Sequence, residues 1–218
     1  MKKQLFTFAV AAAVASISSV ANAQLLDEVR ERGYVQCGVT EGVSGFSIPD
    51  ENNNWVGIEV DYCRAVAAAI FDDPDAVRYT PLNSTVRWEA LSGGSVDILS
   101  RQTTWTMQRD TELGITFVGT MFYDGQGFMV RADSGVTSVM ELSGATICIE
   151  QGTTTELNAA DYFAANGLEF VPQTFVGQDE TVQTYEDGGC DAYTTDSSVL
   201  ASERSGFADP SAHIILPE

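Results

Sequence analysis

The fold of this 218-residue chain is decided by the stretch Val96-Asp97-Ile98-Leu99-Ser100-Arg101-Gln102-Thr103-Thr104-Trp105-Thr106-Met107-Gln108-Arg109. Its first four residues predict a short β-strand, and the polar residues after them lead into a predicted helix. In open α/β sheets, ligands lie beyond the carboxyl ends of the strands. Arg109 follows such an end, and its paired donors match a carboxylate, although a surface arginine on an ordinary helix has the same spacing. The stretch therefore predicts a ligand site close to Arg109.

Strand-like and helix-like segments alternate on both sides of this stretch. The predicted strands are 34–39, 77–80, 96–99, 128–130, 146–149, 170–175 and 191–194. The predicted helices are 60–71, 86–91, 154–165, 179–185 and 197–203. This alternation predicts an α/β fold whose open sheets carry helices on both faces. The glycines in 123–127 mark the expected lobe boundary, with lobe 1 over 24–125, lobe 2 over 126–218 and a hinge at about 124–130.

Two further loops follow predicted strand ends. Gln151-Gly152-Thr153-Thr154-Thr155-Glu156 opens a helix, whose free N–H groups favour an anion, although Thr153 and Glu156 alone would form a capping box. Asp196 ends the strand in Asp191-Ala192-Tyr193-Thr194-Thr195-Asp196, where its carboxylate could pair with an ammonium group or serve as a helix N-cap. Together with Arg109, these loops provide a cation and a helix N-terminus for the ligand's carboxylate, and a carboxylate for its ammonium group.

The N-terminus has the order of a secretory signal peptide. Lys2 and Lys3 precede an apolar stretch, 5–20, and Ala21-Asn22-Ala23 is a small-x-small cleavage site. This order predicts residues 1–23 as a signal peptide, cleavage after about Ala23 and a periplasmic protein; a membrane anchor is the alternative reading. The chain has a formal net charge of −20, which repels nucleic acid and anionic membranes and excludes them as partners.

Four cysteines follow the predicted signal peptide, and an exported chain favours their pairing as disulfides. Pairing within each half gives Cys37 with Cys63 and Cys148 with Cys190; free buried cysteines are the alternative. His213 is the only histidine, and no cluster of metal-ligating residues stands in the sequence. We therefore expect neither a metal nor another cofactor.

Several stretches resemble a known family. They are Gly38-Val39-Thr40 with Gly45-Phe46-Ser47, Trp55-Val56-Gly57-Ile58-Glu59-Val60-Asp61, the stretch from Val96 to Arg109, and Gly152-Thr153-Thr154. The chain resembles bacterial periplasmic solute-binding proteins of family 3, and among them the general L-amino-acid-binding components of polar amino-acid ABC transporters. The resemblance implies a two-lobed periplasmic-binding-protein type II fold. It also implies a monomer that captures a free L-amino acid by lobe closure and delivers it to an inner-membrane ABC permease.

The resemblance assigns roles to residues by position. Arg109 matches the arginine that binds the ligand's α-carboxylate, assisted by the backbone of Thr104 and by the loop of Thr154. The Thr104 hydroxyl, the Gln102 carbonyl and Asp196 match the groups that hold the α-ammonium.

Two further positions are weaker candidates. Glu41 lies in the loop where the family contacts the ligand's side chain. Trp105 is absent from many members at that place, and it either lines the cleft or packs the lobe.

The chain departs from the family at its C-terminus. Family members continue beyond the position of Glu218 with a crossover and helices that return to the first lobe, so we expect a C-terminally truncated form of the fold without this return segment. The alternatives to a binding protein are a periplasmic enzyme like the cyclohexadienyl dehydratases and a sensory ligand-binding module. No GxSxG motif or Cys/His pair supports an enzyme.

Overall fold

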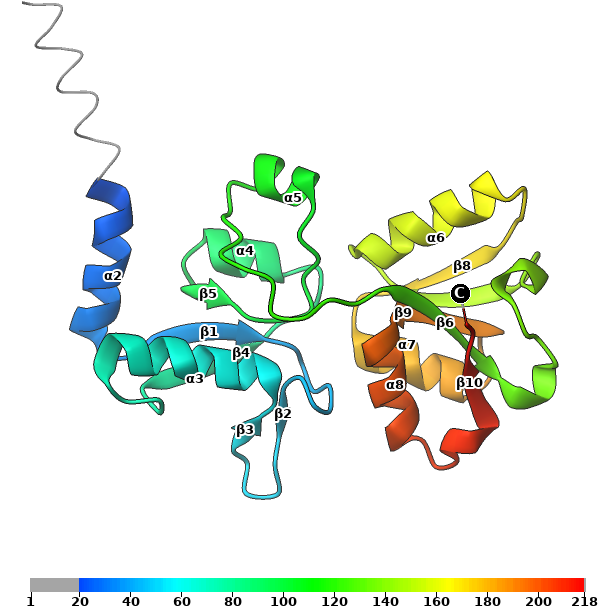
Figure 1. The fold of residues 1–218 in the computed structure, drawn as a ribbon, viewed down its shortest axis with the longest axis horizontal. Helices are drawn as coiled ribbons and strands as arrows, with labels where there is room; N and C mark the ends of the chain where they lie inside the picture. The colour runs from blue at the N-terminus through cyan, green and yellow to red at the C-terminus, as the bar shows by residue number, and fades with distance from the viewer. Residues whose placement is uncertain (1–19, 218) are drawn as a thin grey trace, which may run out of the picture.

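The computed structural model describes residues 20–217, and side chains from residue 24 onward. Two α/β lobes lie side by side, joined by a long extended segment between α5 (Met107–Glu112) and β6 (Gln126–Arg131) (Figure 1). Residues 1–19 of the predicted signal peptide lie outside the described part, and residues 20–23 form the start of α2 (Val20–Arg32); the signal peptide and its cleavage after about Ala23 stay predictions. Within the described part no helix is long and apolar enough to cross a membrane.

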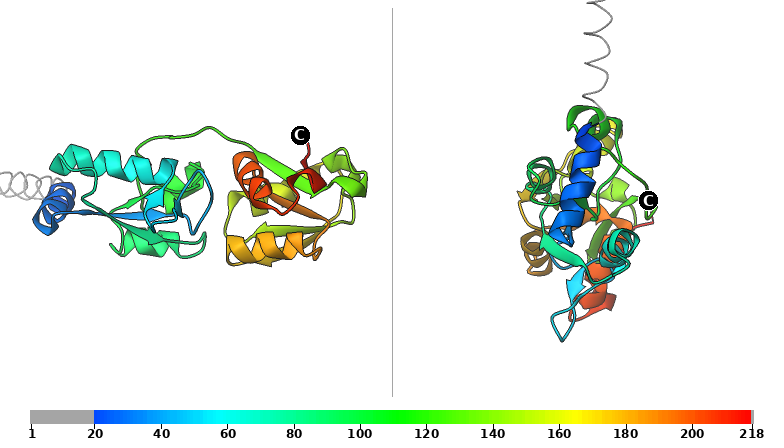
Figure 2. Two further views of the ribbon diagram at one scale, coloured as in Figure 1. Left: turned by 90° about the horizontal axis from the view of Figure 1, so that it is seen from below. Right: turned by 90° about the vertical axis from the view of Figure 1, so that its left-hand side faces the viewer.

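The first lobe is built on a three-stranded parallel sheet with the order β4-β1-β5. Its strands are β1 (Val35–Val39), β4 (Val77–Pro81) and β5 (Ile98–Leu99), and a hairpin of β2 (Ile48–Pro49) and β3 (Trp55–Val56) projects from it. Its helices are α2 (Val20–Arg32), α3 (Ile58–Phe71), α4 (Arg87–Ser92) and α5. Helix α3 covers one face of the sheet and α4 the other, so the central strand β1 is buried (Figure 2).

The second lobe is built on a five-stranded mixed sheet with the order β10-β6-β9-β7-β8. Its strands are β6, β7 (Thr146–Glu150), β8 (Val171–Phe175), β9 (Ala192–Asp196) and β10 (His213–Ile215). Its helices are α6 (Thr154–Ala165), α7 (Gln178–Glu186) and α8 (Ser197–Gly206), with short 3-10 turns at Ala132–Ser134, Val139–Glu141 and Pro210–Ala212. The strands β7, β8 and β9 are parallel, whereas β6 is antiparallel to both β9 and β10.

Strand β6 shows why both faces of this sheet are covered. Phe128 packs with Phe163 of α6 on one face, whereas Met129 packs with Tyr185 of α7 and Leu200 of α8 on the other. Successive side chains of a strand point to opposite faces, so a continuous apolar run fills two cores. This two-sided burial confirms the helix-covered open sheet that the alternation predicts.

Most predicted elements appear within one or two residues of their expected ends, and helix 154–165 has its expected bounds. The sequence did not predict α2, the β2–β3 hairpin or β10. The strand expected at 96–99 is shorter, because Asp97 uses its carboxylate to accept the backbone N–H of Gln36 and to pair with Arg32. A side chain thus replaces part of the expected ladder.

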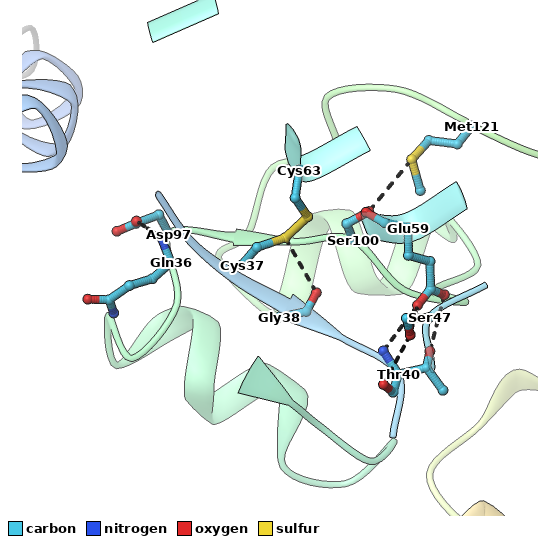
Figure 3. Close-up of a disulfide and its surroundings, with 10 residues drawn as sticks. All are labelled: Gln36, Cys37, Gly38, Thr40, Ser47, Glu59, Cys63, Asp97, Ser100 and Met121. Atoms are coloured by element: carbon cyan, nitrogen blue, oxygen red, sulfur yellow. Dashed lines mark hydrogen bonds between the residues drawn. A yellow bond between two sulfur atoms is a disulfide. The ribbon is translucent and has the colours of Figure 1, made fainter. Parts of the chain in front are cut away.

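Each lobe contains one disulfide. Cys37 of β1 is bonded to Cys63 of α3, with the Cα atoms 6.3 Å apart (Figure 3). Cys148 of β7 is bonded to Cys190 just before β9, with a Cα separation of 5.7 Å. This is the pairing within halves that the sequence predicts, and it ties strand to helix or strand to strand without joining the lobes.

The segment 113–125 forms no helix or strand. Strand β6 begins at Gln126, and residues 126–130 of the expected hinge range are hydrogen-bonded to β9 in the second sheet. The lobe boundary at 125/126 and the hinge at about 124–130 stay predictions.

Candidate ligand-binding site

The ends of three strands meet where the lobes face each other. The loop after β5 comes from the first lobe, and the loop after β7 and the end of β9 come from the second. They enclose a cavity of about 20 Å³. It is lined by Ser84, Arg87, Arg101, Gln102, Thr104, Arg109, Glu150, Thr153, Thr154, Thr155, Gln178, Thr195 and Asp196. The sequence predicts this place, because carboxyl ends of parallel strands gather at one edge of each sheet.

Arg109 lies in the first turn of α5 and turns back toward the strand end. Thr106 caps the helix by accepting the backbone N–H of Arg109 at 3.2 Å. The guanidinium donates from Nη1 to the carbonyl oxygen of Thr104 at 2.9 Å. Arg109 is only 9% exposed, so it is not an ordinary surface arginine. Burial lowers its pKa, as does the charge of Arg101, whereas Asp196 opposes the shift.

Two more arginines line the same cavity, and the sequence analysis missed both. Arg87 donates from Nη1 to the carbonyl oxygen of Gln102 at 3.1 Å and from Nη2 to that of Gly152 at 3.5 Å. Arg101 donates from Nη1 to the hydroxyl of Ser84 at 3.2 Å. Within residues 20–217, no carboxylate oxygen lies within 4 Å of the three guanidinium groups. Burial is the main cause that lowers the pKa of each of them.

Trp88 lies beside two of these guanidinium groups. Cζ of Arg87 is 4.4 Å from the centroid of its ring and Cζ of Arg109 is 5.1 Å away. The negative face of an indole ring attracts cations. Trp88 thus stabilises the guanidinium groups of Arg87 and Arg109, two like charges that repel each other near the cavity.

The loop after β7 combines a helix cap with a contact to the other lobe. Thr153 accepts the backbone N–H of Glu156 at 3.2 Å, and Glu156 accepts that of Gly152 at 2.9 Å. The two residues therefore cap α6 together, as the capping-box alternative in the sequence analysis predicted. The neighbouring Thr154 additionally places its hydroxyl 3.0 Å from the hydroxyl of Thr104 across the cavity.

Asp196 ends β9 and stands at the N-cap position of α8. Its side chain makes no capping hydrogen bond, so the N-cap reading does not account for the carboxylate. Burial raises the pKa of Asp196 most, and Asp124 adds to this, while Arg87, Arg101 and Arg109 lower it. The carboxylate faces the arginines but forms no ion pair within the described chain. It can therefore accept a cationic group.

The remaining candidates are placed less centrally. The Gln102 carbonyl lines the cavity but already accepts a hydrogen bond from Arg87. Glu41 is exposed and outside the lining, although the charge of Arg101 acts on it; burial raises its pKa. Trp105 is 50% exposed and stacks on Phe117, with ring centroids 5.3 Å apart. It lines a larger, mostly apolar hollow of about 610 Å³ beside the linker, and this hollow shares Arg101, Gln102, Thr104, Thr154, Thr155 and Asp196 with the small cavity.

A buried carboxylate fixes the loop that carries Glu41. Glu59 accepts hydrogen bonds from the Thr40 backbone N–H at 3.1 Å, the Thr40 hydroxyl at 3.1 Å and the Ser47 hydroxyl at 2.7 Å (Figure 3). The hydroxyl of Ser100, at the end of β5, donates to the backbone carbonyl of Glu59 at 2.9 Å. This network ties the ends of β1 and β5 to α3. Burial raises the pKa of Glu59 in spite of its hydrogen bonds.

Direct hydrogen bonds join the lobes around the cavity. The backbone N–H of Ser84 donates to Glu150 at 3.1 Å, and the hydroxyl of Ser202 donates to the carbonyl oxygen of Ser44 at 2.7 Å. A cavity of about 20 Å³ holds on the order of one water molecule. This cavity is therefore too small for an amino acid, but it shares Arg101, Gln102, Thr104, Thr154, Thr155 and Asp196 with a hollow of about 610 Å³, and a hollow of that size is large enough for one.

Two of the residues that the sequence analysis missed, Glu150 and Arg101, share one signal. Glu150 ends β7 as Asp196 ends β9, and Arg101 comes two residues after β5. Each lies at or just after the carboxyl end of a strand, on the edge of the sheet that faces the cavity. A search of every strand end for charged residues would have found both of them. Ser84, Arg87 and Gln178 come from loops and helix starts that carry no such signal.

The two α/β lobes have the periplasmic-binding-protein type II fold. Residues 35–203 match bacterial extracellular solute-binding proteins, family 3. The chain belongs to this family.

Several relatives are known by name. The general L-amino acid-binding periplasmic protein AapJ of Rhizobium johnstonii is 51% identical over the whole chain, which covers 64% of that protein. The glutamate/glutamine/aspartate/asparagine-binding protein BztA of Rhodobacter capsulatus is 47% identical, with the same coverage of 100% and 64%. The chain thus spans slightly less than two thirds of the length of these curated relatives.

Solved structures agree with the fold. A periplasmic binding protein of an ABC transporter from Brucella ovis, with glutathione bound, is 52% identical with a TM-score of 0.86, over 88% of this chain and 61% of that one. The cysteine-binding protein from Campylobacter jejuni has a TM-score of 0.76 at 26% identity, over 87% and 73% of the two chains.

Proposed function

We propose that this chain captures a free L-amino acid between its lobes and hands it, chemically unchanged, to an ABC transporter in the inner membrane. Arg109 binds the α-carboxylate, with Thr104 and Thr154 beside it. Asp196 and the hydroxyl of Thr104 hold the α-ammonium, with the carbonyl of Gln102. The observation that carries this proposal is a buried Arg109 that has no carboxylate partner within the described chain but has Asp196 close by.

The relatives support this reading. AapJ and BztA are both named as amino-acid-binding proteins, and a further relative from Escherichia coli is named a putative amino-acid ABC transporter-binding protein. Glu41 and Trp105 are retained as lesser contributors to the ligand's side-chain end. We further propose a monomer, exported to the periplasm after cleavage near Ala23, with an inner-membrane permease as its partner.

Capture proceeds by separation and closure of the lobes, 24–125 and 126–218, about a hinge near 124–130 next to the unstructured linker. Ligand contacts come from both lobes, so the ligand stabilises the closed state more than the open one. A ligand that binds the native state also raises its apparent stability.

Titration calorimetry with the twenty L-amino acids tests the proposal. We expect binding in the unmodified chain and a loss of at least about 100-fold in affinity for every bound amino acid in Arg109→Ala, because a buried charged clamp is removed. Arg30→Ala is the matched control, since Arg30 is exposed on α2 far from the cavity. Unchanged affinity in Arg109→Ala would rule out the carboxylate clamp. Recovery of the intact ligand after incubation distinguishes a binder from an enzyme.

A further inference from the structure

Strand β10 is a short edge strand of the second sheet. It has three residues and pairs with β6, along which it runs antiparallel (Figure 1). Just beyond it, the backbone N–H of Leu216 donates to the carbonyl oxygen of Phe128 at 2.8 Å. A strand this short makes few ladder hydrogen bonds, so its docking depends strongly on how its side chains are held.

The first residue of β10 is His213, and its ring is packed into the core between the sheet and α7. The side chain is 8% exposed. The centroid of its ring is 4.6 Å from that of Phe207 and 5.4 Å from that of Tyr185. Nδ1 of His213 is 3.0 Å from the hydroxyl oxygen of Tyr185. An imidazole thus holds the start of the strand in place.

The contact with Tyr185 requires a neutral imidazole. Tyr185 is fully buried, and burial raises the pKa of its hydroxyl, so the hydroxyl keeps its proton. Within the described chain the only hydrogen-bond partner of this hydroxyl is Nδ1 of His213. A buried hydroxyl needs an acceptor for its proton, and neutral imidazole accepts through one ring nitrogen. Protonated imidazole has a hydrogen on both nitrogens, so the hydroxyl of Tyr185 would lose its acceptor.

The pairing of β10 with β6 opposes the same protonation. His213 lies directly opposite Arg131 in the antiparallel ladder, and like charges in such cross-strand positions are destabilising. The guanidinium of Arg131 is fixed, because Nη2 donates to the carbonyl oxygen of Tyr185 at 2.7 Å and Cζ is 5.2 Å from the centroid of the Tyr185 ring. A charged His213 would therefore face a cation that other contacts hold in place.

Other charged groups face His213 from the elements packed against it. Burial lowers the pKa of His213 most, and the charge of Arg131 on β6 adds to this. Glu186 of α7 and Asp209, which precedes β10, raise this pKa, whereas Arg204 of α8 lowers it further. The two carboxylates therefore oppose the lowering only in part.

We propose that β10 is an acid-sensitive strap: neutral His213 docks it on β6 and Tyr185, and protonation of His213 releases it. Release uncovers the edge of β6, the strand into which the linker leads (Figure 1). None of the groups that surround His213 lines the small cavity or the larger hollow. The inference thus goes beyond the proposed function and stands independently of it.

The direction of the pH effect follows from proton linkage. In the released strand His213 is in water and has the ordinary histidine pKa of about 6.5, whereas the docked strand binds this proton less tightly. The contribution of His213 to docking is therefore complete above the ordinary range. It is lost as pH falls through the lowered pKa of the docked state.

Hydrogen exchange measured by mass spectrometry, on the ligand-free chain without a histidine tag, tests the proposal. After correction for the intrinsic exchange rate, protection of peptides that contain β10 should fall about tenfold from about pH 7.5 to about pH 5. Peptides from β7, in the centre of the same sheet, should not show this fall. In His213→Asn the amide oxygen can replace Nδ1 as the acceptor without titrating, so its β10 protection should change no more than that of β7.

A second measurement reads the proton directly. His213 is the only histidine in the chain, so its ring signals in a proton NMR spectrum give its pKa without ambiguity. A pKa below about 6.5 is expected, and a value at or above it would overturn the proposal. The proposal also fails if β10 loses no more protection than β7 in the unmodified chain, or if His213→Asn loses as much as the unmodified chain. If circular dichroism shows that His213→Asn does not fold, exchange and NMR on the unmodified chain still decide.

Discussion

Glu59 illustrates at the scale of one residue how a charge can position a loop at a cost in stability. Its carboxylate is 1% exposed and accepts three hydrogen bonds from Thr40 and Ser47. Glutamine keeps one acceptor oxygen for the Thr40 N–H and the Ser47 hydroxyl, and its amide can donate to the Thr40 hydroxyl. The network can thus persist without the charge.

Glu59→Gln should therefore reduce the pH dependence of stability. Burial raises the folded-state pKa of Glu59, so the folded chain holds this proton more tightly than the unfolded chain. The free energy of unfolding then falls as pH rises from the ordinary glutamate range through the raised pKa. Urea unfolding from about pH 4 to about pH 8 should show this fall in the parent and a smaller one in the variant.

Two variants calibrate this result. Glu59→Leu leaves the donors of Thr40 and Ser47 without an acceptor and should cost about 3 kcal/mol. Glu89→Gln, on the exposed side of α4, should change the free energy of unfolding by less than about 0.5 kcal/mol. An identical pH profile for Glu59→Gln and the parent would show that burial of this charge does not matter to stability.

The sequence predicted part of the candidate site and missed another part for a physical reason. Arg109, Thr104 and Asp196 follow strand ends, and this position can be recognised along one chain segment. Arg101 stands in the same segment, but the neighbours that define its surroundings, such as Glu150, lie about fifty residues away in the other lobe. The place of Arg101 after β5 can be read from the sequence, but its burial depends on how the lobes meet, which no local pattern contains.

At the scale of elements, the start of α6 combines structural and ligand-facing roles. Thr153 caps the helix and also donates its hydroxyl to the carbonyl oxygen of Glu150 at 2.7 Å. The cap therefore fixes the end of β7 relative to α6. Through this link the helix start keeps Thr154 in place opposite Thr104.

Thr153→Ala should lower the free energy of unfolding by about 1 kcal/mol, because the first turn of α6 loses its N-cap acceptor. Thr111→Ala is the matched control, since Thr111 is exposed within α5 and its hydroxyl donates only to carbonyls of its own helix. It should cost less than about 0.5 kcal/mol. Equal losses in urea unfolding would show that the cap contributes nothing particular to α6.

Helices and strands could be predicted from the sequence where they are long enough to show a regular apolar pattern. Helix α6 has a capping box and a periodic apolar face, so its bounds could be read directly. Strands β2, β3 and β10 have two or three residues each, which is too short for an alternating pattern. Strand β10 exists because β6 offers it a free edge, and a tertiary cause of this kind leaves no local signal.

At the scale of the whole molecule, each lobe is braced internally, and polar contacts and the linker join the two lobes. Both disulfides lie within a lobe. The contacts across the cavity are hydrogen bonds such as Ser84 to Glu150 and Ser202 to Ser44. Individual hydrogen bonds of this kind contribute about 1 kcal/mol each, so the lobes can separate without either of them unfolding.

A covalent link at the rim of the cavity tests whether separation is required. Ser202 of α8 donates to the backbone of Ser44 at 2.7 Å, and neither residue lines the small cavity. In the double variant Ser44→Cys/Ser202→Cys, an oxidised link should hold the lobes together. Because the proposed ligand groups come from both lobes and Thr104 and Thr154 meet across the space between them, we expect ligand association to slow by at least about tenfold.

Stopped-flow tryptophan fluorescence with added amino acid measures this rate. Mild reduction should restore it, because Cys37, Cys63 and Cys148 are fully buried and their native disulfides are shielded from the reductant. The single variants Ser44→Cys and Ser202→Cys control for the substitutions themselves and should bind at the parent rate. If the oxidised double variant binds as fast as the reduced one, ligand reaches the site by another route, and movement of the loops within one lobe must account for entry.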